Sequence, residues 1–315
     1  MKRSSDNSRV KITQLGEIAC SCLTPGQRGK VLAAFSKAIY LLTDDSELIW
    51  ISNTEVPMHQ RCVQVSSHLP GLSAGVPFHV QDHCLMIDSA FAFNIQDALV
   101  WRAPHMESRH VLGIPNHSER VQTFFSNLDI SQAKGFGNFI PHILFLSQES
   151  STDIPPELSD SILLFAHPLV MGIARACAED QPSQISQNAD ALVGLGAGLT
   201  PSGDDFLGGF LFAVKNIQTM NADMNLIDYE IPVDPYSSQT NLISFTLLKD
   251  LANGQAIAPL HHILNILLSG ESLESIYPFV SKLTRVGHST GWDLLTGLLT
   301  GLLVTYRESC FTPHK

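Results

Sequence analysis

Two patterns of hydrophobic and polar positions divide the chain. From about residue 28 to 147, short apolar runs are separated by polar or proline-containing stretches, which is typical of strands joined by turns. Beyond residue 150, apolar residues recur at intervals of three and four, which is helical spacing. We therefore expect an α+β protein. Its β-rich domain, barrel-like or an open antiparallel sheet, covers residues 1–150, and a mainly α-helical domain covers residues 151–315.

The individual elements follow from the same pattern. A polar turn at residues 44–47 lies between apolar runs at 38–43 and 48–52, which predicts a β-hairpin. Further strands are expected at residues 61–66, 76–80, 84–87 and 143–146, and a helix at 118–128. In the second domain we expect helices at residues 158–178, 184–192, 204–218, 237–253, 258–268, 273–283 and 291–308.

Composition narrows the function classes. Thirty acidic and 19 basic residues give the 315-residue chain a net charge of −11 without a basic stripe, so nucleic acid and anionic membranes are not expected as partners. The polar N-terminus lacks the apolar region of a signal peptide, and the late apolar segment 294–306 is shorter than a membrane span. We expect a cytoplasmic protein whose six cysteines, without a Cys-x-x-Cys pair, are free thiols.

The main candidate site is the segment GLGAGLTPSGDDFLGG at residues 194–209. A glycine turn leaves backbone amides free to bind an anion, and the following helix N-terminus favours negative charge. Thr200 and Ser202 add hydroxyl groups. The lysine of a Walker loop and the third glycine of a dinucleotide fingerprint are missing, so no nucleotide is expected. Asp204 and Asp205 would repel an anion, but a divalent Mg²⁺ or Mn²⁺ between them and a phosphorylated ligand would reconcile the two features.

A second helix start has the same residue types. In the segment RVGHSTGWD, at residues 285–293, Thr290-x-x-Asp293 resembles a capping box, and His288 adds an imidazole. Two such starts in one domain favour a shared site. The predicted catalytic residues are Asp204, Asp205 and His288, with both aspartates as metal ligands. The predicted ligand-binding residues are Gly196, Gly198, Thr200, Ser202, Gly203, Gly287, Ser289 and Thr290.

Helix capping alone is the structural alternative for the first motif. Thr200 or Ser202 can cap the helix, Pro201 suits its first turn, and the aspartates complement its dipole. Capping does not explain the glycines before the cap. It also leaves Gly208 and Gly209 inside the helix, at about 1 kcal/mol each relative to alanine. Close approach of another helix or of a ligand would account for them.

The two motifs, in this order behind a strand-rich first half, resemble a bacterial family long catalogued as a domain of unknown function. One branch of that family is a subunit of oxamate carbamoyltransferase, which acts in anaerobic allantoin degradation, a route of purine catabolism. The resemblance implies a transferase that converts oxalurate and phosphate into oxamate and carbamoyl phosphate in a hetero-oligomer with two other subunits.

The resemblance also implies roles for residues. The glycine amides, Thr200 and Ser202 would hold phosphate or carbamoyl phosphate, and Asp204 and Asp205 would hold the metal. His288 would move a proton or bond the carbonyl oxygen. The Ser-x-Arg-Thr phosphate signature of better-known carbamoyltransferases is absent, so the site would differ from theirs. A non-catalytic structural subunit, and another metal-dependent hydrolase or transferase of small molecules, remain open alternatives.

Overall fold

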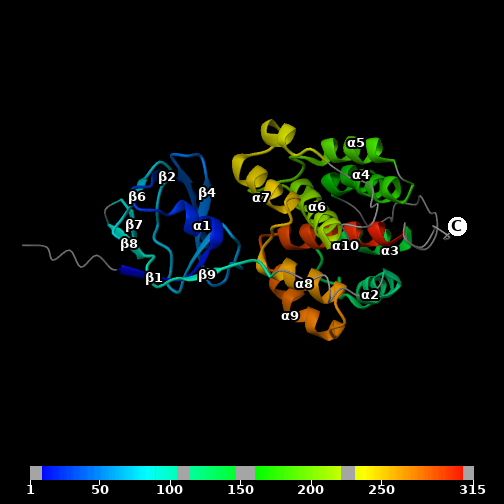
Figure 1. Cartoon of the computed structure of the whole chain (residues 1–315). Coiled ribbons are helices and arrows are strands. Elements are labelled where there is room, and N and C mark those ends of the chain that lie inside the picture. The colour runs from blue at the N-terminus through cyan, green and yellow to red at the C-terminus, as the bar shows by residue number, and fades with distance from the viewer. Residues whose placement is uncertain are drawn as a thin grey trace, which may run out of the picture. The chain divides into compact units, whose positions relative to one another are not determined.

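The computed structural model describes residues 9–88, 90–104, 114–146, 160–179, 181–220 and 231–307. The chain forms two compact units, residues 1–104 and 105–315 (Figure 1). The boundary that the sequence predicts at residues 150–151 lies outside the described residues. The chain divides earlier than this because helices α2 (Ile114–Asn127) and α3 (Ile140–Leu146) contribute Val121, Phe124 and Ile143 to the core of the second unit.

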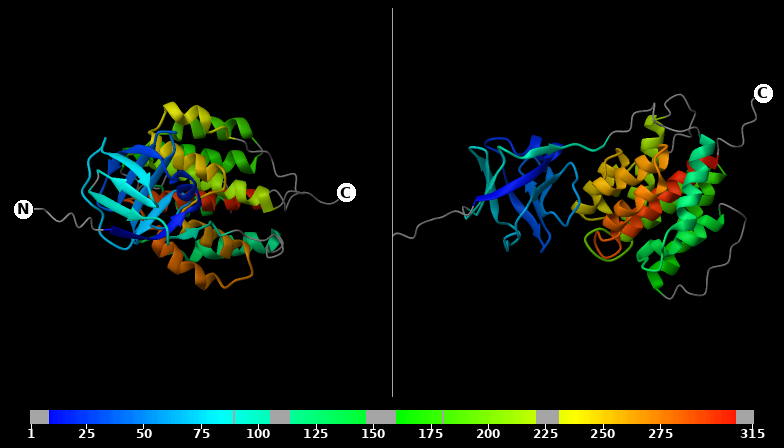
Figure 2. Two further views of the ribbon diagram at one scale, coloured as in Figure 1. Left: turned by 60° about the vertical axis from the view of Figure 1, so that its left-hand side comes forward. Right: turned by 90° about the horizontal axis from the view of Figure 1, so that it is seen from below.

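The first unit is an eight-stranded β-barrel with one additional strand. Its strands lie in the order β5-β4-β3-β2-β6-β7-β8-β1, β5 pairs back with β1 to close the barrel, and β9 extends along β1. Figure 2 shows these strands, blue to cyan, from two further directions. They are β1 (Arg9–Gly16), β2 (Arg28–Ala34), β3 (Ala38–Thr43), β4 (Leu48–Asn53), β5 (Cys62–Val65), β6 (Pro77–Gln81), β7 (Cys84–Ile87), β8 (Phe91–Asn94) and β9 (Leu99–Trp101), with one short helix, α1 (Glu17–Cys22). The barrel-like form of the predicted α+β fold is therefore confirmed.

The predicted hairpin is confirmed as the antiparallel pair β3–β4. Alternate side chains of its two strands, such as Ile39 and Leu41 of β3 with Ile49 and Ile51 of β4, are fully buried in the barrel core. This is the two-residue period of a strand with one face turned inward.

The second unit is helical, with α4 (Ser161–Ala178), α5 (Pro182–Leu192), α6 (Ser202–Met220), α7 (Leu242–Ala252), α8 (Ala258–Leu268), α9 (Tyr277–Leu283) and α10 (Thr290–Arg307) following α2 and α3. The 3₁₀ turns η2 (Gly135–Phe139), η3 (Asp234–Ser238) and η4 (Leu273–Ile276) interrupt them. The predicted strand at residues 143–146 is wrong, because this segment is part of α3. A short, wholly apolar run has no period to separate strand from helix, and here Ile140 and Ile143 are buried one helical turn apart.

Two long predicted helices are each divided in the structure. Residues 237–253 separate into η3 and α7, because the Asn241 side chain accepts hydrogen bonds from the amides of Ile243 and Ser244 and so caps a new helix start. Residues 273–283 separate into η4 and α9.

Helices α6 and α10 make the most extensive contact between elements and lie in the middle of the second unit in Figure 1. Glycines allow their backbones to touch. A Cβ atom at Gly209 would overlap the carbonyl oxygen of Leu294, and one at Gly297 would overlap that of Phe206. One turn further, a Cβ at Gly301 would lie 2.7 Å from the Cβ of Ala213. Close helix packing therefore explains Gly209 inside α6, as the sequence analysis anticipated.

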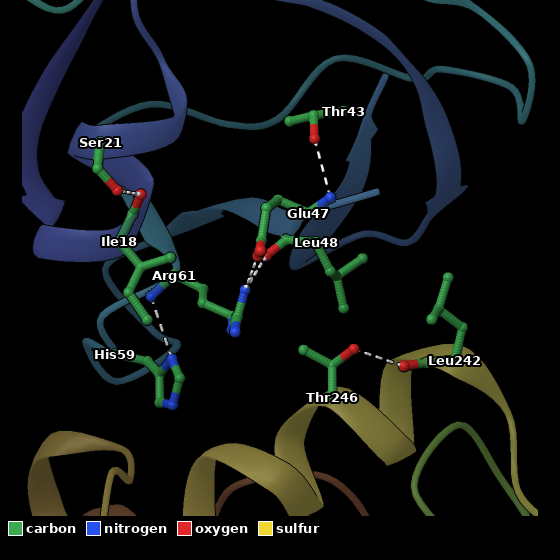
Figure 3. Close-up of polar contacts among 9 residues, drawn as sticks. All are labelled: Ile18, Ser21, Thr43, Glu47, Leu48, His59, Arg61, Leu242 and Thr246. Atoms are coloured by element: carbon green, nitrogen blue, oxygen red, sulfur yellow. Dashed lines mark hydrogen bonds and ion pairs between the residues drawn. The ribbon is translucent and has the colours of Figure 1, made fainter. Parts of the chain in front are cut away.

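A group of polar side chains lies at one end of the barrel (Figure 3). Arg61 donates to Glu47 Oε2 at 2.8 Å and to the carbonyl of Leu48 at 3.1 Å, and its own amide donates to His59 Nδ1 at 3.1 Å. His59 also stacks on Trp50, with 5.0 Å between ring centroids. Burial of this imidazole, together with the nearby Arg61 charge, lowers the pKa of His59 to about 3.

The pKa of His59 predicts acid sensitivity. The unfolded chain takes up a proton on this histidine below pH about 6.5, whereas the folded chain does not until pH about 3, so stability is lost as pH falls between these values. The expected slope approaches about 1.4 kcal/mol per pH unit in that window. Urea unfolding at several pH values, followed by tryptophan fluorescence, should show a shallower slope for His59→Gln. The exposed imidazole of His68 provides the control, His68→Gln, which should leave the slope unchanged.

Candidate functional site

The N-termini of α6 and α10 lie side by side and form the candidate site. The hydroxyl groups of Thr200 and Thr290 are 3.0 Å apart, and those of Ser202 and Ser289 are 3.3 Å apart. Each pair joins the first glycine-rich motif to the second. The structure therefore brings together two segments that are separated by about 90 residues in the sequence.

The loop before α6 presents free amides. Gly194, Gly196 and Gly198 have φ values of 73°, 125° and 106°, a region that only glycine enters readily. Within the described part of the chain, the amides of residues 196–200 donate no hydrogen bond. Ala197 and Gly198 are exposed. These donors are available to an anion beside a helix N-terminus.

Asp204 holds this loop in place. Its Oδ1 accepts a hydrogen bond from the amide of Gly194 at 2.6 Å, and its Oδ2 accepts from the hydroxyls of Thr240 and Ser244, the latter at 2.6 Å. Asn241 adds a bond to the carbonyl of Leu199 at 2.8 Å. Both oxygens of Asp204 are thus engaged within the protein, and this carboxylate connects the glycine loop to α7.

Asp205 and Asp293 form the second carboxylate arrangement. Each is the fourth residue of its helix, α6 or α10, and their side chains are only 5% and 0% exposed. Each has an Oδ2 atom that is buried and accepts no hydrogen bond from the described residues. Buried polar atoms are nearly always hydrogen-bonded, so two such atoms at one place require an explanation.

The electrostatics of this pair follow from burial and like charge. Burial raises the pKa of Asp205 well above its usual range, and the neighbouring Asp293 charge raises it further. Burial also raises the pKa of Asp293 to about 7. Polar neighbours oppose these shifts. Thr200 and Thr290 lower the pKa of Asp205, and the Phe136 amide, Ser202 and Ser289 lower the pKa of Asp293.

The turn η2 completes the surroundings of Asp293. The amide of Phe136 donates to Asp293 Oδ1 at 2.6 Å. Gly135 has a φ of 53°, and a Cβ atom there would overlap the same oxygen. The sequence pattern indicates only a cap at Asp293 and does not point to Gly135 or Phe136. The sequence does contain a signal that Asp293 corresponds to Asp205, and this signal is a spacing. Helix α6 carries Asp205, Gly209 and Ala213 at four-residue intervals, and α10 carries Asp293, Gly297 and Gly301 at the same intervals.

The remaining predicted residues have simpler positions. Gly203 packs against the carbonyl of Leu192, and Gly287, with a φ of 63°, forms the turn before α10. His288 is exposed, and no other described residue forms a hydrogen bond with it. Its catalytic role stays a prediction.

The barrel contains a separate polar cavity of about 510 Å³. Arg61 and Glu47, which pair with one another, line it together with Cys22. Burial raises the pKa of the Cys22 thiol, which therefore remains protonated at neutral pH. Cys20, Cys22, Cys62, Cys84 and Cys177 are free thiols, as expected.

Fold and site together define an α+β protein with a β-barrel followed by a helical unit that carries paired acidic helix N-termini. Residues 192–302, about a third of the chain, match the family model described as oxamate carbamoyltransferase subunit AllH. The match contains both helix starts, and it confirms the family resemblance noted from the sequence. No curated protein and no solved structure gives a significant match to the chain. No helix among the described residues is both long and apolar enough to cross a membrane.

Proposed function

We propose that the chain is a cytoplasmic subunit of an oxamate carbamoyltransferase and acts with two other subunits to convert oxalurate and phosphate into oxamate and carbamoyl phosphate. The family match at residues 192–302 supports the subunit assignment. In this proposal, the paired N-termini of α6 and α10 bind the small anionic substrate, and the enzyme is complete only in the hetero-oligomer.

The amides of residues 196–200, which donate no hydrogen bond to any residue that the structure describes, are the observation that carries the ligand-binding part of this proposal. Helix packing explains Gly209, Gly297 and Gly301, and a purely structural subunit needs no more than that. It does not need a loop of positive-φ glycines, beside two helix N-termini, whose amides donate no hydrogen bond to a described residue. A phosphate or carboxylate group satisfies these donors and is stabilised by both helix dipoles. The hydroxyls of Thr200 and Ser202 supply further donors beside the loop.

Carbamoyl transfer by the reconstituted three-subunit enzyme tests the proposal. Thr200→Val keeps the side-chain shape but removes a donor, and we expect it to lower the rate at least tenfold. The control is Thr219→Val, which removes an exposed hydroxyl near the other end of α6. It should leave the rate unchanged.

Two results would contradict the proposal. One is full transfer activity by the other subunits without this chain. The other is an unchanged rate for Thr200→Val together with no shift in Tm when phosphate, carbamoyl phosphate, oxamate or oxalurate is added to the assembled enzyme. The first result would contradict the assignment of the chain as a subunit of the enzyme, and the second would contradict the ligand site at the two helix N-termini.

A further inference from the structure

The geometry points to a divalent cation site formed by Asp205 and Asp293, rather than by the adjacent pair Asp204 and Asp205. This site takes a hard, oxygen-ligated ion such as Mg²⁺ or Mn²⁺. What the ion does there rests on the proposed function, in which it lies between the carboxylates and the anionic ligand. Binding of the ion does not depend on that function.

Two buried carboxylate oxygens define the cation site. Asp205 Oδ2 and Asp293 Oδ2 are both buried and accept no hydrogen bond from the described residues. The helix starts that carry the two carboxyl groups touch, with 3.0 Å between the hydroxyls of Thr200 and Thr290 and 3.3 Å between those of Ser202 and Ser289, and the Asp293 charge acts on Asp205. Two buried like charges are unfavourable, and a cation of charge +2 neutralises both while it satisfies both free oxygens.

The other donors at this place are hydroxyl oxygens. Thr200 and Thr290 lie at Asp205, and Ser202 and Ser289 lie at Asp293, so each helix start contributes two hydroxyls and one carboxylate. An all-oxygen set of this kind favours Mg²⁺ or Mn²⁺ over softer metals. No group of three or more His, Cys, Asp or Glu side chains suited to a metal was found in the described ranges. The ion therefore keeps several water ligands, as Mg²⁺ commonly does.

Asp204 is excluded from the donor set by its own contacts. Both of its oxygens accept hydrogen bonds, from the amide of Gly194 and from the hydroxyls of Thr240 and Ser244. Neighbouring residues on a helix point about 100° apart, so Asp204 and Asp205 turn to different sides of α6. Asp293 takes the place that the sequence analysis gave to Asp204, because it occupies the same helical position in α10 as Asp205 does in α6.

The test is Mn²⁺ binding to the metal-free full-length chain, measured by titration calorimetry and by the EPR signal of free Mn²⁺. The buffer contains 0.15 M salt, which screens non-specific attraction to an acidic protein. We expect one saturable site, which Mg²⁺ displaces. Asp205→Asn and Asp293→Asn should each weaken binding at least tenfold, with circular dichroism confirming that both variants are folded.

The matched control is Asp160→Asn. Asp160 caps α4 through hydrogen bonds to the amides of Ile162 and Leu163, so it is another acid at a helix N-terminus, and asparagine retains the cap. This variant should bind Mn²⁺ as the unaltered chain does. If either Asp→Asn variant fails to fold, Ser202→Ala and Thr290→Val keep both carboxylates and should still weaken binding.

Three outcomes overturn the inference. They are the absence of saturable binding to the unaltered chain, undiminished binding by folded Asp205→Asn and Asp293→Asn, and equal weakening by Asp160→Asn. The test uses neither substrate nor companion subunits. Mn²⁺ binding without carbamoyl transfer would therefore defeat the proposed function and leave the cation site intact, and transfer without Mn²⁺ binding would do the reverse.

Discussion

Gly297→Ala is expected to lower the stability of the chain by about 3 kcal/mol. The added Cβ atom would overlap the carbonyl oxygen of Phe206 and lie 2.8 Å from the amide nitrogen of Phe210. Both atoms belong to the backbone of α6, which cannot rotate away as a side chain does. The helices must move apart, and Tm should fall by roughly 10 °C in differential scanning calorimetry.

Gly172→Ala is the control for this substitution, since it also changes a glycine inside a helix of the second unit. Its Cβ atom would meet the side-chain nitrogen of Asn188 at 2.7 Å, and that side chain can turn aside. The better helix propensity of alanine offsets the adjustment, so we expect little change or a small gain in Tm. Equal Tm values for Gly297→Ala and the unaltered chain would show that α6 and α10 do not require backbone contact.

Asp204→Ala and Asp293→Asn are expected to change stability in opposite directions. Removal of the Asp204 carboxylate leaves three donors without their acceptor, on Gly194, Thr240 and Ser244, and should destabilise the metal-free chain by about 3 kcal/mol or more. Asp293→Asn keeps the oxygen that accepts from Phe136 and removes a charge that repels Asp205. Its new amide can donate to that carboxylate, so we expect a gain of about 1 kcal/mol.

Urea unfolding at pH 8 in the presence of EDTA measures both changes. Asp234→Asn is a suitable reference, because Asp234 is 80% exposed and its ion pair with Lys249 lies on the surface. A loss of stability in Asp293→Asn as large as that in Asp204→Ala would mean that both aspartates serve the fold alone. A loss of stability in Asp204→Ala together with a gain in Asp293→Asn would show that the Asp204 carboxylate stabilises the fold and that the Asp293 carboxylate destabilises it.

Much of the fold is predictable from local pattern. The alternation of apolar side chains in β3 and β4 and the three-and-four spacing of the leucines in α10 depend only on neighbouring residues, and both elements are found where they are expected. The error at residues 143–146 has a local cause as well, because a short apolar run fits either a strand or a helix. Closure of the barrel by β1 and β5 is a pairing between distant strands, and periodicity carries no information about it.

The candidate site shows the same limit. The proximity of the two glycine-rich helix starts was inferred from their similar residues, and the structure brings Thr200 and Ser202 against Thr290 and Ser289. The sequence does not show which aspartate is fully hydrogen-bonded within the protein and which has a buried oxygen without a described partner. Asp204 is the aspartate with both oxygens hydrogen-bonded because Thr240 and Ser244, 36 and 40 residues away in the sequence, donate to it. The hydrogen bond to Asp293 comes from Phe136 in η2, 157 residues before it.

The long separation between the two helix starts has a kinetic consequence. Contacts such as that between Phe136 and Asp293 close very large loops, and such contacts form late and slow the folding of a chain. The chain between the two carboxylates contains α7, α8 and α9, so their meeting also closes a large loop. Refolding followed by Mn²⁺ uptake would then report a late step of assembly, whereas helix formation seen by circular dichroism would precede it.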